Sequence, residues 1–264
     1  MIAFPVDLPR LAAMRAALKF TVFSLWLLLM VLVCLLPWAL HLEALRRRLV
    51  SFTFRVAVRL LGLRVIVHGP PATQRPLLVV SNHSSYADIY ALGAVMPVSF
   101  TPKSDIKSWP FINLCCYVSG CVFIERKASK MQQVRQEIAS RLRMGRPICL
   151  FAEGTTSNGT QLKPFKSGFF SLAEGIEDLF VQPVTIAYTH INGQAINAQE
   201  RLQIAWIDDT ALLPHFWHFL SFRSVTVQVV CHAPVRAAAF DSRKALCLSC
   251  ETEIAHSLQQ QLAE

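Results

Sequence analysis

The feature that most constrains this fold is an apolar segment near the N-terminus. From Phe20 to Leu40 the chain has 21 residues without a charged side chain. A helix of that length, at about 1.5 Å per residue, spans the roughly 30 Å hydrocarbon core of a bilayer. The run is too long for a cleaved signal peptide, and no small-x-small cleavage site follows it before Arg46. It therefore predicts a helical membrane anchor. Basic residues flank both ends, so the orientation stays open, as does the choice between a full span and a one-leaflet or re-entrant helix.

The next segment, residues 42–63, mixes arginines with apolar residues over a helical length. Arg46, Arg55 and Arg59 stand among leucine, valine and phenylalanine residues, and Gly62 ends the pattern. This mixture is typical of a helix at a membrane interface, and a core-facing helix with solvated arginines is the alternative. The whole chain is 53% hydrophobic and 16% charged, against about 25% charged residues in a typical soluble domain. Both observations favour association with a membrane.

The net charge of the chain indicates which binding partners to expect, and its cysteines indicate the cellular compartment. The net charge of +9 fits an anionic membrane surface or acidic substrates. Nucleic acid is not expected, because no motif interleaves aromatic and basic residues. Most of the eight cysteines lie in apolar runs, and Cys247 and Cys250 fall in a helical pattern without a second pair nearby. We therefore expect reduced thiols, a cytoplasmic environment and no metal site.

From residue 64 onward, apolar strand-length runs alternate with helical patterns. This order predicts an α/β fold with a mixed sheet flanked by helices, and a division into an anchor region, 1–63, and a catalytic domain, 64–264. Pro183 predicts that its strand lies at an edge or a bulge. The expected strands are 64–68, 77–80, 95–101, 120–124, 147–151, 181–188, 202–206 and 225–230, and the expected helices include 112–118, 130–144, 169–175, 215–220 and 241–263.

A histidine and an aspartate lie at one of the predicted strand-to-helix corners. The sequence Asn82-His83-Ser84-Ser85-Tyr86-Ala87-Asp88 follows a buried strand, and Ser84 or Ser85 is the expected helix N-cap. Within one helix, residues five apart point about 140° away from each other. The pair can therefore meet only if His83 precedes the helix. Asp88 would then hold one imidazole nitrogen and leave the other to take a proton. A capped helix with an incidental histidine is the alternative.

Two further strand ends carry polar residues. Glu125 and Arg126 follow one predicted strand, and Glu153, Gly154 and Thr155 follow another. Ligands of α/β sheets bind outside such strand ends. The nearby cations Lys103, Lys163 and Lys166 could join Arg126 in binding phosphate or could face lipid headgroups. No G-x-S-x-G nucleophile elbow is present, so a bound alcohol is the expected nucleophile, with His83 as its base.

Four ordered blocks make the sequence resemble the glycerophospholipid acyltransferase family, which includes 1-acylglycerol-3-phosphate acyltransferases. The resemblance covers roughly residues 60–240, and the fixed order of several blocks makes it specific. The blocks are Asn82-His83-x4-Asp88, Gly120-x-x-Phe123-Ile124-Glu125-Arg126, Phe151-Ala152-Glu153-Gly154-Thr155-Thr156-Ser157 and Pro183-Val184.

The resemblance implies a reaction and a site. His83 and Asp88 would activate a lysolipid hydroxyl to attack an acyl thioester of coenzyme A or acyl carrier protein. Substrate binding would fall to Asn82, Lys103, Arg126, Glu153, Gly154, Thr155 and Lys166. The expected acceptor is 1-acylglycerol-3-phosphate, which would give phosphatidic acid. Neither a metal nor a cofactor is implied. The expected location is a bacterial inner membrane, with the catalytic domain facing the cytoplasm.

Two departures from the family pattern bear on the acceptor. Ala152 replaces a proline, and Thr156 replaces an arginine that would bind an anion in bidentate fashion. Ala205-Trp206-Ile207-Asp208-Asp209 and Pro214-His215-Phe216-Trp217 also resemble a subgroup that includes lyso-ornithine lipid acyltransferases. O-acylation of lyso-ornithine lipid is therefore the alternative reaction. A lipid hydrolase and a catalytically silent lipid-binding protein are more remote alternatives.

Overall fold

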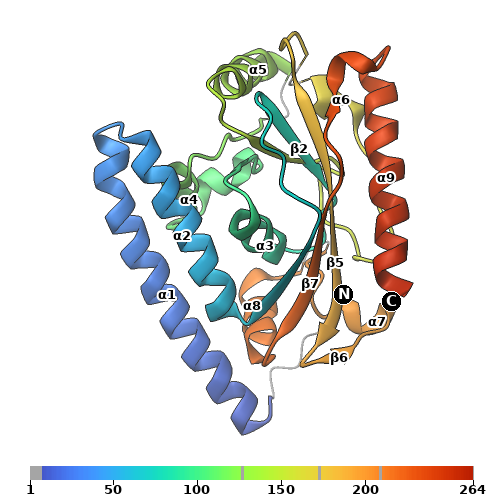
Figure 1. The fold of residues 1–264 in the computed structure, drawn as a ribbon. Helices are drawn as coiled ribbons and strands as arrows, with labels where there is room; N and C mark the ends of the chain where they lie inside the picture. The colour runs from blue at the N-terminus through green and yellow to red at the C-terminus, as the bar shows by residue number, and fades with distance from the viewer. Residues whose placement is uncertain (1–7, 126–127, 172–173, 208–209, 264) are drawn as a thin grey trace.

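A twisted mixed sheet forms the centre of the molecule. The computed structural model describes residues 8–125, 128–171, 174–207 and 210–263. The strand order is β1-β7-β5-β2-β4-β3, with β6 and β8 pairing with β5 (Figure 1). β5 runs parallel to β2 but antiparallel to β7, which makes the sheet mixed. The strands are β1 Leu63–His68, β2 Leu77–Ser81, β3 Ser99–Phe100, β4 Ile148–Phe151, β5 Phe180–Ile191, β6 Gln194–Ala195, β7 Val225–Cys231 and β8 Val235–Arg236.

Helices cover both faces of this sheet, as the sequence predicts. Figure 1 shows α1, α2, α3 and α8 on one side and α9 on the other. The α-helices are α1 Arg10–Ala39, α2 Glu43–Leu61, α3 Ala87–Val95, α4 Ile112–Ser119, α5 Ala128–Arg143, α6 Ser167–Phe170, α7 Ala198–Arg201, α8 Leu212–Ser221 and α9 Arg243–Ala263. Gly62 ends α2 in the left-handed conformation, where a residue without a Cβ is favoured.

Two apolar clusters fill the spaces between the sheet and its helices. Alternate residues of β2 point to opposite faces, so that Val79 belongs to the first cluster and Val80 to the second. The first cluster joins the sheet to α1, α2, α3 and α8, and the second joins it to α5 and α9. Because β2 is buried on both faces, its C-terminal end has a fixed position from which a site can be built.

Helix α1 packs along the body of the protein rather than away from it. Lys19 Nζ donates to the carbonyls of Leu61 and Phe222, at 3.0 and 2.8 Å. Phe23 is buried and contacts Tyr90 and Phe216. The opposite side of α1 exposes leucines, among them Leu25 (62%) and Leu32 (56%). By length and composition, α1 is also apolar enough to cross a membrane.

Two predicted strands are wrong. Residues 120–124 make one bridge, Lys103 with Ile124, while Val122 and Ile124 donate to carbonyls of the neighbouring segment. Residues 202–206 continue from α7 in turns, because Gln203 and Ile204 donate to Glu200 and Arg201. Both segments are short apolar runs. The hydrophobic period of such a run does not distinguish a strand from turns that pack against a core.

Of the two alternatives predicted at Pro183, the edge strand is wrong, whereas the pairing is irregular. Val184 pairs with Cys231 and Val181 with Val235, so the partner segment has one extra residue. Pro183 lies in β5, which has strands on both sides and pairs with β2 at this position. Its other side faces the connection between β7 and β8, where His232 N–H donates to the Pro183 carbonyl at 3.1 Å. A proline has no N–H to donate. This proline is tolerated because the missing donor faces a break in the neighbouring ladder.

Candidate active site

The histidine and the aspartate meet at the corner after β2. His83 lies before α3, and its Nδ1 donates to Asp88 Oδ2 at 2.8 Å. The same carboxylate oxygen accepts the N–H groups of Ser84 and Ser85, at 2.7 and 2.9 Å. Asp88 is fully buried, whereas the His83 side chain is 17% exposed. The corner therefore holds the imidazole by one nitrogen and leaves Nε2 for a substrate. The predicted serine N-cap is wrong, since the cap position is Tyr86.

Two residues from other strands complete the surroundings of the pair. Tyr188 of β5 donates its hydroxyl to Asp88 Oδ1 at 2.6 Å. Phe151 of β4 stacks on the imidazole with ring centroids 3.9 Å apart. Charge-assisted hydrogen bonds of this length are among the stronger ones in proteins. Both carboxylate oxygens of Asp88 are therefore held by hydrogen bonds, and stacking on Phe151 fixes the plane of the His83 ring.

Glu153 holds the loop of the third block against the corner. Its Oε1 accepts the His83 N–H at 2.7 Å, and its Oε2 accepts the Lys163 N–H at 2.8 Å. Burial raises the pKa of Glu153 to about 7, although these two donors oppose the shift. Ser157 also fixes the corner, because its N–H and hydroxyl both donate to the His83 carbonyl. Glu153 therefore positions backbone on both sides of the site.

Asn82, Gly154 and Lys166 lie around the same corner in different ways. The side-chain amide of Asn82 donates to the Ile186 carbonyl and accepts the Ile186 N–H, each at 2.8 Å. This side chain therefore links the end of β2 to β5. Gly154 has φ +71°, and a Cβ there would lie 2.9 Å from Phe169 and 3.1 Å from Lys166 Nζ. The glycine lets the Lys166 ammonium approach the backbone of the third block. The predicted binding roles of these residues stay predictions.

One of the two departures from the family pattern, Thr156, contacts the segment that resembles the lyso-ornithine subgroup. The Thr156 hydroxyl, buried where the family has an arginine, donates to the Trp206 carbonyl. The Trp206 N–H in turn donates to the Ser84 carbonyl at 2.8 Å. Residues 205–207 thereby close the edge of the corner through a neutral contact.

The remaining predicted site residues are Arg126, Thr155 and Lys103. Arg126 lies outside the described residues. Thr155 is partly buried, and Lys103 is exposed at the end of β3. Among the described residues, no group of three or more histidine, cysteine, aspartate and glutamate side chains is arranged to hold a metal ion.

Tyr188 and Phe151 are the contacts that sequence reasoning missed. Phe151 begins the third block, but its position there does not indicate a stacked ring. Tyr188 ends an apolar strand and has the signature of an ordinary core residue.

A buried carboxylate that orients a histidine at a strand end is the arrangement of a general base in an α/β enzyme. A family model described as "Acyltransferase" matches residues 64–187. The chain is 38% identical to a lyso-ornithine lipid O-acyltransferase of Brucella abortus, over 82% of this chain and 84% of that protein. It is 31% identical to a 1-acyl-sn-glycerol-3-phosphate acyltransferase of Neisseria gonorrhoeae, over 70% of each chain. The chain therefore belongs to the acyltransferase family.

The fold agrees with this assignment. The crystal structure of the 1-acyl-sn-glycerophosphate acyltransferase PlsC from Thermotoga maritima superposes with a TM-score of 0.65 at 19% identity. The match covers 94% of this chain and 98% of that one. It includes the α1–α2 region as well as the sheet, because so little of this chain lies outside the alignment.

Proposed function

We propose that the protein transfers a fatty acyl chain from an acyl thioester to the hydroxyl of lyso-ornithine lipid. The contact between Thr156 and Trp206 is the observation that supports lyso-ornithine lipid as the acceptor. A neutral, hydrogen-bonded threonine occupies the position where a phosphate-binding arginine would stand. Trp206 belongs to the segment that resembles the lyso-ornithine subgroup, and it bonds the catalytic corner through Ser84.

The geometry supports a mechanism of general-base catalysis. His83 Nε2 takes the proton of the acceptor hydroxyl while Asp88 holds Nδ1–H and stabilises the imidazolium. The hydroxyl oxygen forms a bond to the thioester carbonyl carbon, and the tetrahedral intermediate then breaks its C–S bond. The leaving thiolate takes the proton from His83, which restores the neutral imidazole. The donor is coenzyme A or acyl carrier protein, and no further cofactor enters the step.

1-Acylglycerol-3-phosphate is the second candidate acceptor. The Lys166 ammonium, close to Gly154 in the third block, offers a positive charge for a phosphate near the corner. A relative of 31% identity bears the name of that activity. The two acceptors differ in whether the headgroup has a phosphate, so a direct comparison of turnover separates them.

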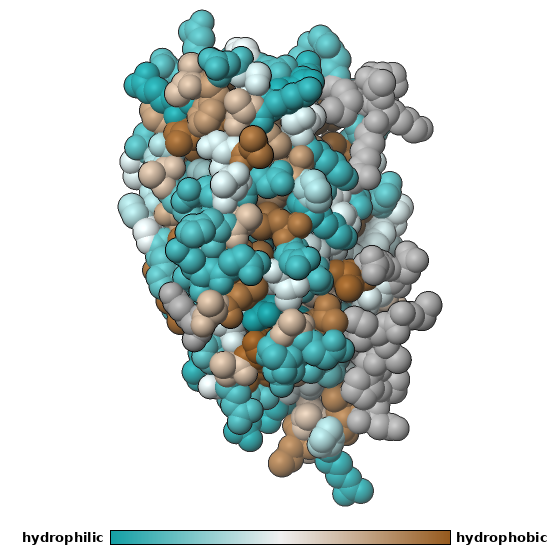
Figure 2. All heavy atoms as spheres, turned by 90° about the vertical axis from the view of Figure 1, so that its right-hand side faces the viewer, coloured by the Kyte–Doolittle hydropathy of each residue, from teal (hydrophilic) through white to brown (hydrophobic). Residues whose placement is uncertain are grey.

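The surface supports attachment to one leaflet of a membrane. One side of α1 makes hydrogen bonds and aromatic contacts with the body of the protein, and these contacts would break if α1 crossed the bilayer alone. The other side exposes leucines to the surroundings. Figure 2, which views the α9 side, shows a mainly hydrophilic surface with scattered apolar residues. We propose that α1 lies in the cytoplasmic leaflet of the inner membrane with the site facing the cytoplasm.

The test incubates the purified full chain with an acyl thioester and each lysolipid separately. We expect acylated ornithine lipid as the main product. His83→Ala should lower turnover by about 10² to 10⁴, the usual contribution of a general base. His256→Ala, at an exposed histidine of α9, is the control and should retain activity.

Each other outcome contradicts part of the proposal. Faster turnover with 1-acylglycerol-3-phosphate would reverse the order of acceptors. Release of free fatty acid without an acceptor would indicate a hydrolase, and inactivity with both acceptors would favour a silent lipid-binding protein. Normal turnover by a folded His83→Ala variant would contradict the mechanism.

A further inference from the structure

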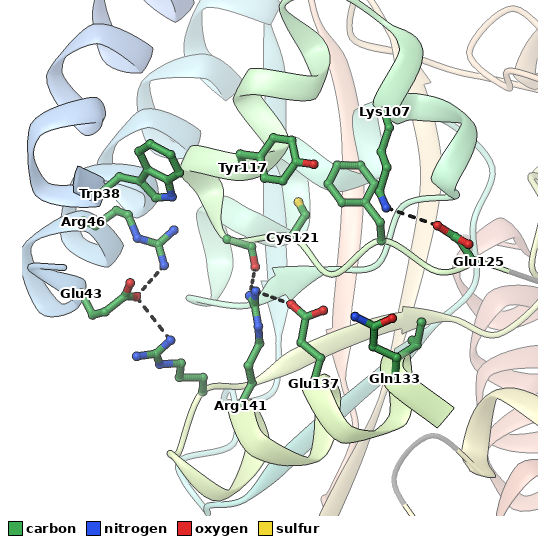
Figure 3. A pocket seen from close by; sticks show the side chains of 14 residues that line it. Trp38, Glu43, Arg46, Lys107, Tyr117, Cys121, Glu125, Gln133, Glu137 and Arg141 are labelled. Carbon is green, nitrogen blue, oxygen red and sulfur yellow. Dashed lines mark hydrogen bonds and ion pairs between the residues drawn. The ribbon is translucent and has the colours of Figure 1, made fainter. Parts of the chain in front are cut away.

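A charged cavity lies apart from the His83 corner, where the α1–α2 hairpin meets α4 and α5. Its volume is about 290 Å³, close to the lower end of the range for small-molecule sites. Figure 3 shows side chains from both helices of the hairpin and from α4 and α5 pointing into it. His83 and Asp88 do not line it. None of the described residues predicted to take part in the reaction lines the cavity, although Gly120, Phe123 and Glu125 of the second block do.

Arg46 is the buried cation of this cavity. It is 5% exposed, donates from Nη1 to the Val118 carbonyl at 2.7 Å, and bonds Glu43 at 2.5 Å. Its Nε–H has no acceptor among the described residues. A Cβ on Gly120 would lie 2.7 Å from Arg46 Nη1, so the glycine of the second block makes room for this guanidinium. Arg141 also donates to the Gly120 carbonyl.

The end of the cavity formed by Glu43, Arg46 and Arg146 has more positive charge than its one carboxylate balances. Glu43 is shared by Arg46 and by Arg146, whose Nη1 lies 3.5 Å away. Arg141 pairs with Glu137 and Lys107 with Glu125, so these charges balance one another (Figure 3). Two guanidinium groups on one carboxylate leave an excess charge for an anion, and arginine is well suited to bind phosphate or carboxylate groups.

Two exposed aromatic residues line the cavity, and the elements around it have exposed apolar side chains. Trp38 and Tyr117 line the cavity and are 45% and 44% exposed. Exposed apolar side chains continue from them along the end of α1, the hairpin turn and α4, namely Leu36, Leu40, Leu42, Leu45, Phe111 and Leu114. Tryptophan and tyrosine are enriched where proteins meet the headgroup region of a membrane. This position favours a lipid over a soluble anion.

We propose that this cavity binds the headgroup of an anionic membrane lipid, at a site separate from that of the acyl acceptor. The headgroup anion would bond Arg46 and Arg146, and the glycerol region would lie between Trp38 and Tyr117. Lipid binding there would fix the α1–α2 hairpin to α5, since Arg46 comes from α2 and Arg146 follows α5.

The test titrates the purified full chain with monomeric dihexanoyl-phosphatidylglycerol in a calorimeter. Dihexanoyl-phosphatidylcholine and glycerol phosphate are titrated in parallel, to separate anionic lipid from neutral lipid and from free phosphate. We expect one site per chain that prefers the anionic lipid. Arg146→Gln should weaken binding about fivefold, the usual effect of one basic residue at an anionic lipid. Because Arg46 is buried, the partly exposed Arg146 is the safer position to change.

Arg143→Gln is the matched control, because Arg143 is on α5 but does not line the cavity. The proposal is supported if Arg146→Gln weakens binding and Arg143→Gln does not. Equal losses in the two variants would indicate diffuse charge attraction, and no loss in either would indicate binding elsewhere, such as at the acceptor site. Equal affinity for glycerol phosphate would show that the acyl chains and the aromatic residues Trp38 and Tyr117 contribute nothing. Each of these three results overturns the proposal.

Discussion

At the scale of single residues, the Tyr188 hydroxyl is the contact with the clearest consequence for activity. It fixes the Asp88 oxygen that His83 does not use, in a fully buried position. Tyr188→Phe removes this bond without changing the shape of the core. We expect kcat to fall about tenfold while KM changes little, because Asp88 would hold His83 less rigidly. The loss of a hydrogen bond to a charged group should also cost about 1.5–3 kcal/mol of stability.

The measurement compares kcat, KM and the pH dependence of kcat for Tyr188→Phe with those for Tyr90→Phe. Tyr90 packs against the same core cluster and is the matched control. A stability loss alone would leave kcat per folded molecule and its pH profile unchanged. That result would assign Tyr188 a purely structural role.

Glu153 makes stability depend on pH in a definite direction. Its pKa is raised by burial from 4.5 to about 7, so between these values the folded state binds the proton and the unfolded state does not. Stability therefore falls as pH rises through this window and is highest below it. One pKa unit corresponds to about 1.4 kcal/mol, so the contribution of Glu153 is about 3 kcal/mol.

Glu153→Gln keeps the side chain neutral and should flatten this part of the pH dependence. The measurement is the free energy of unfolding of both proteins at several values between pH 4.5 and 7. If the free energies of unfolding of the two proteins depend on pH in the same way, Glu153 is not the source of the pH dependence. An exposed glutamate, Glu177, serves as a control through Glu177→Gln.

Local spacing predicted the His83–Asp88 pair, but not the residues around it. The two residues are five positions apart, and the corner geometry was sufficient to join them. Tyr188 is 100 positions from Asp88, and only the pairing of β5 with β2 brings it to the corner. Phe151 reaches His83 through the pairing of β4 with β2 in the same way. Contacts of this kind depend on strand order, which one sequence does not specify.

At the scale of elements, sequence reasoning was most reliable for long periodic segments. The helix limits near residues 61, 143 and 263 and the buried strand at Leu77–Ser81 agree with the structure. The wrong predictions were short runs near turns and the edge position of the strand with Pro183. At Pro183 a partner distant in sequence, His232, determines the local structure, whereas residues 202–206 form turns with their neighbours in the chain.

The exposed leucines of α1 should drive membrane binding. Leu25→Gln removes an apolar side chain that is 62% exposed, and Leu248→Gln removes one that is 64% exposed on α9. Burying a leucine in lipid contributes about 1.5–3 kcal/mol, so the first change should weaken vesicle binding about tenfold and the second should not. Glutamine keeps a good helix propensity, so both helices should stay intact. Co-sedimentation with vesicles measures the effect, and equal binding by the two variants would contradict a role for the α1 face.

At the scale of the whole molecule, the hairpin and the sheet share one core. The predicted division at residue 63 stays a prediction, but Ala16 and Phe23 of α1 and Leu61 of α2 belong to the first cluster together with Val79 and Val227. Arg15 also donates to the Ser221 carbonyl at the end of α8. The structure therefore indicates that residues 64–264 lack part of their own core.

A chain that begins at residue 64 should consequently fail to fold as a cooperative unit. The fragment would lose Ala16, Phe23 and Leu61 from the apolar cluster that also contains Leu220 of α8 and Val225 of β7. Exposed core surface of this kind favours aggregation or a loosely packed state that binds apolar dyes. Thermal unfolding and dye binding of the 64–264 fragment measure this, with a chain of residues 8–264 as the matched control. Cooperative unfolding of the shorter fragment at the midpoint of the control would show that the hairpin is a separable anchor. Loss of cooperativity in the shorter fragment alone would show that α1 and α2 are a structural part of the catalytic unit.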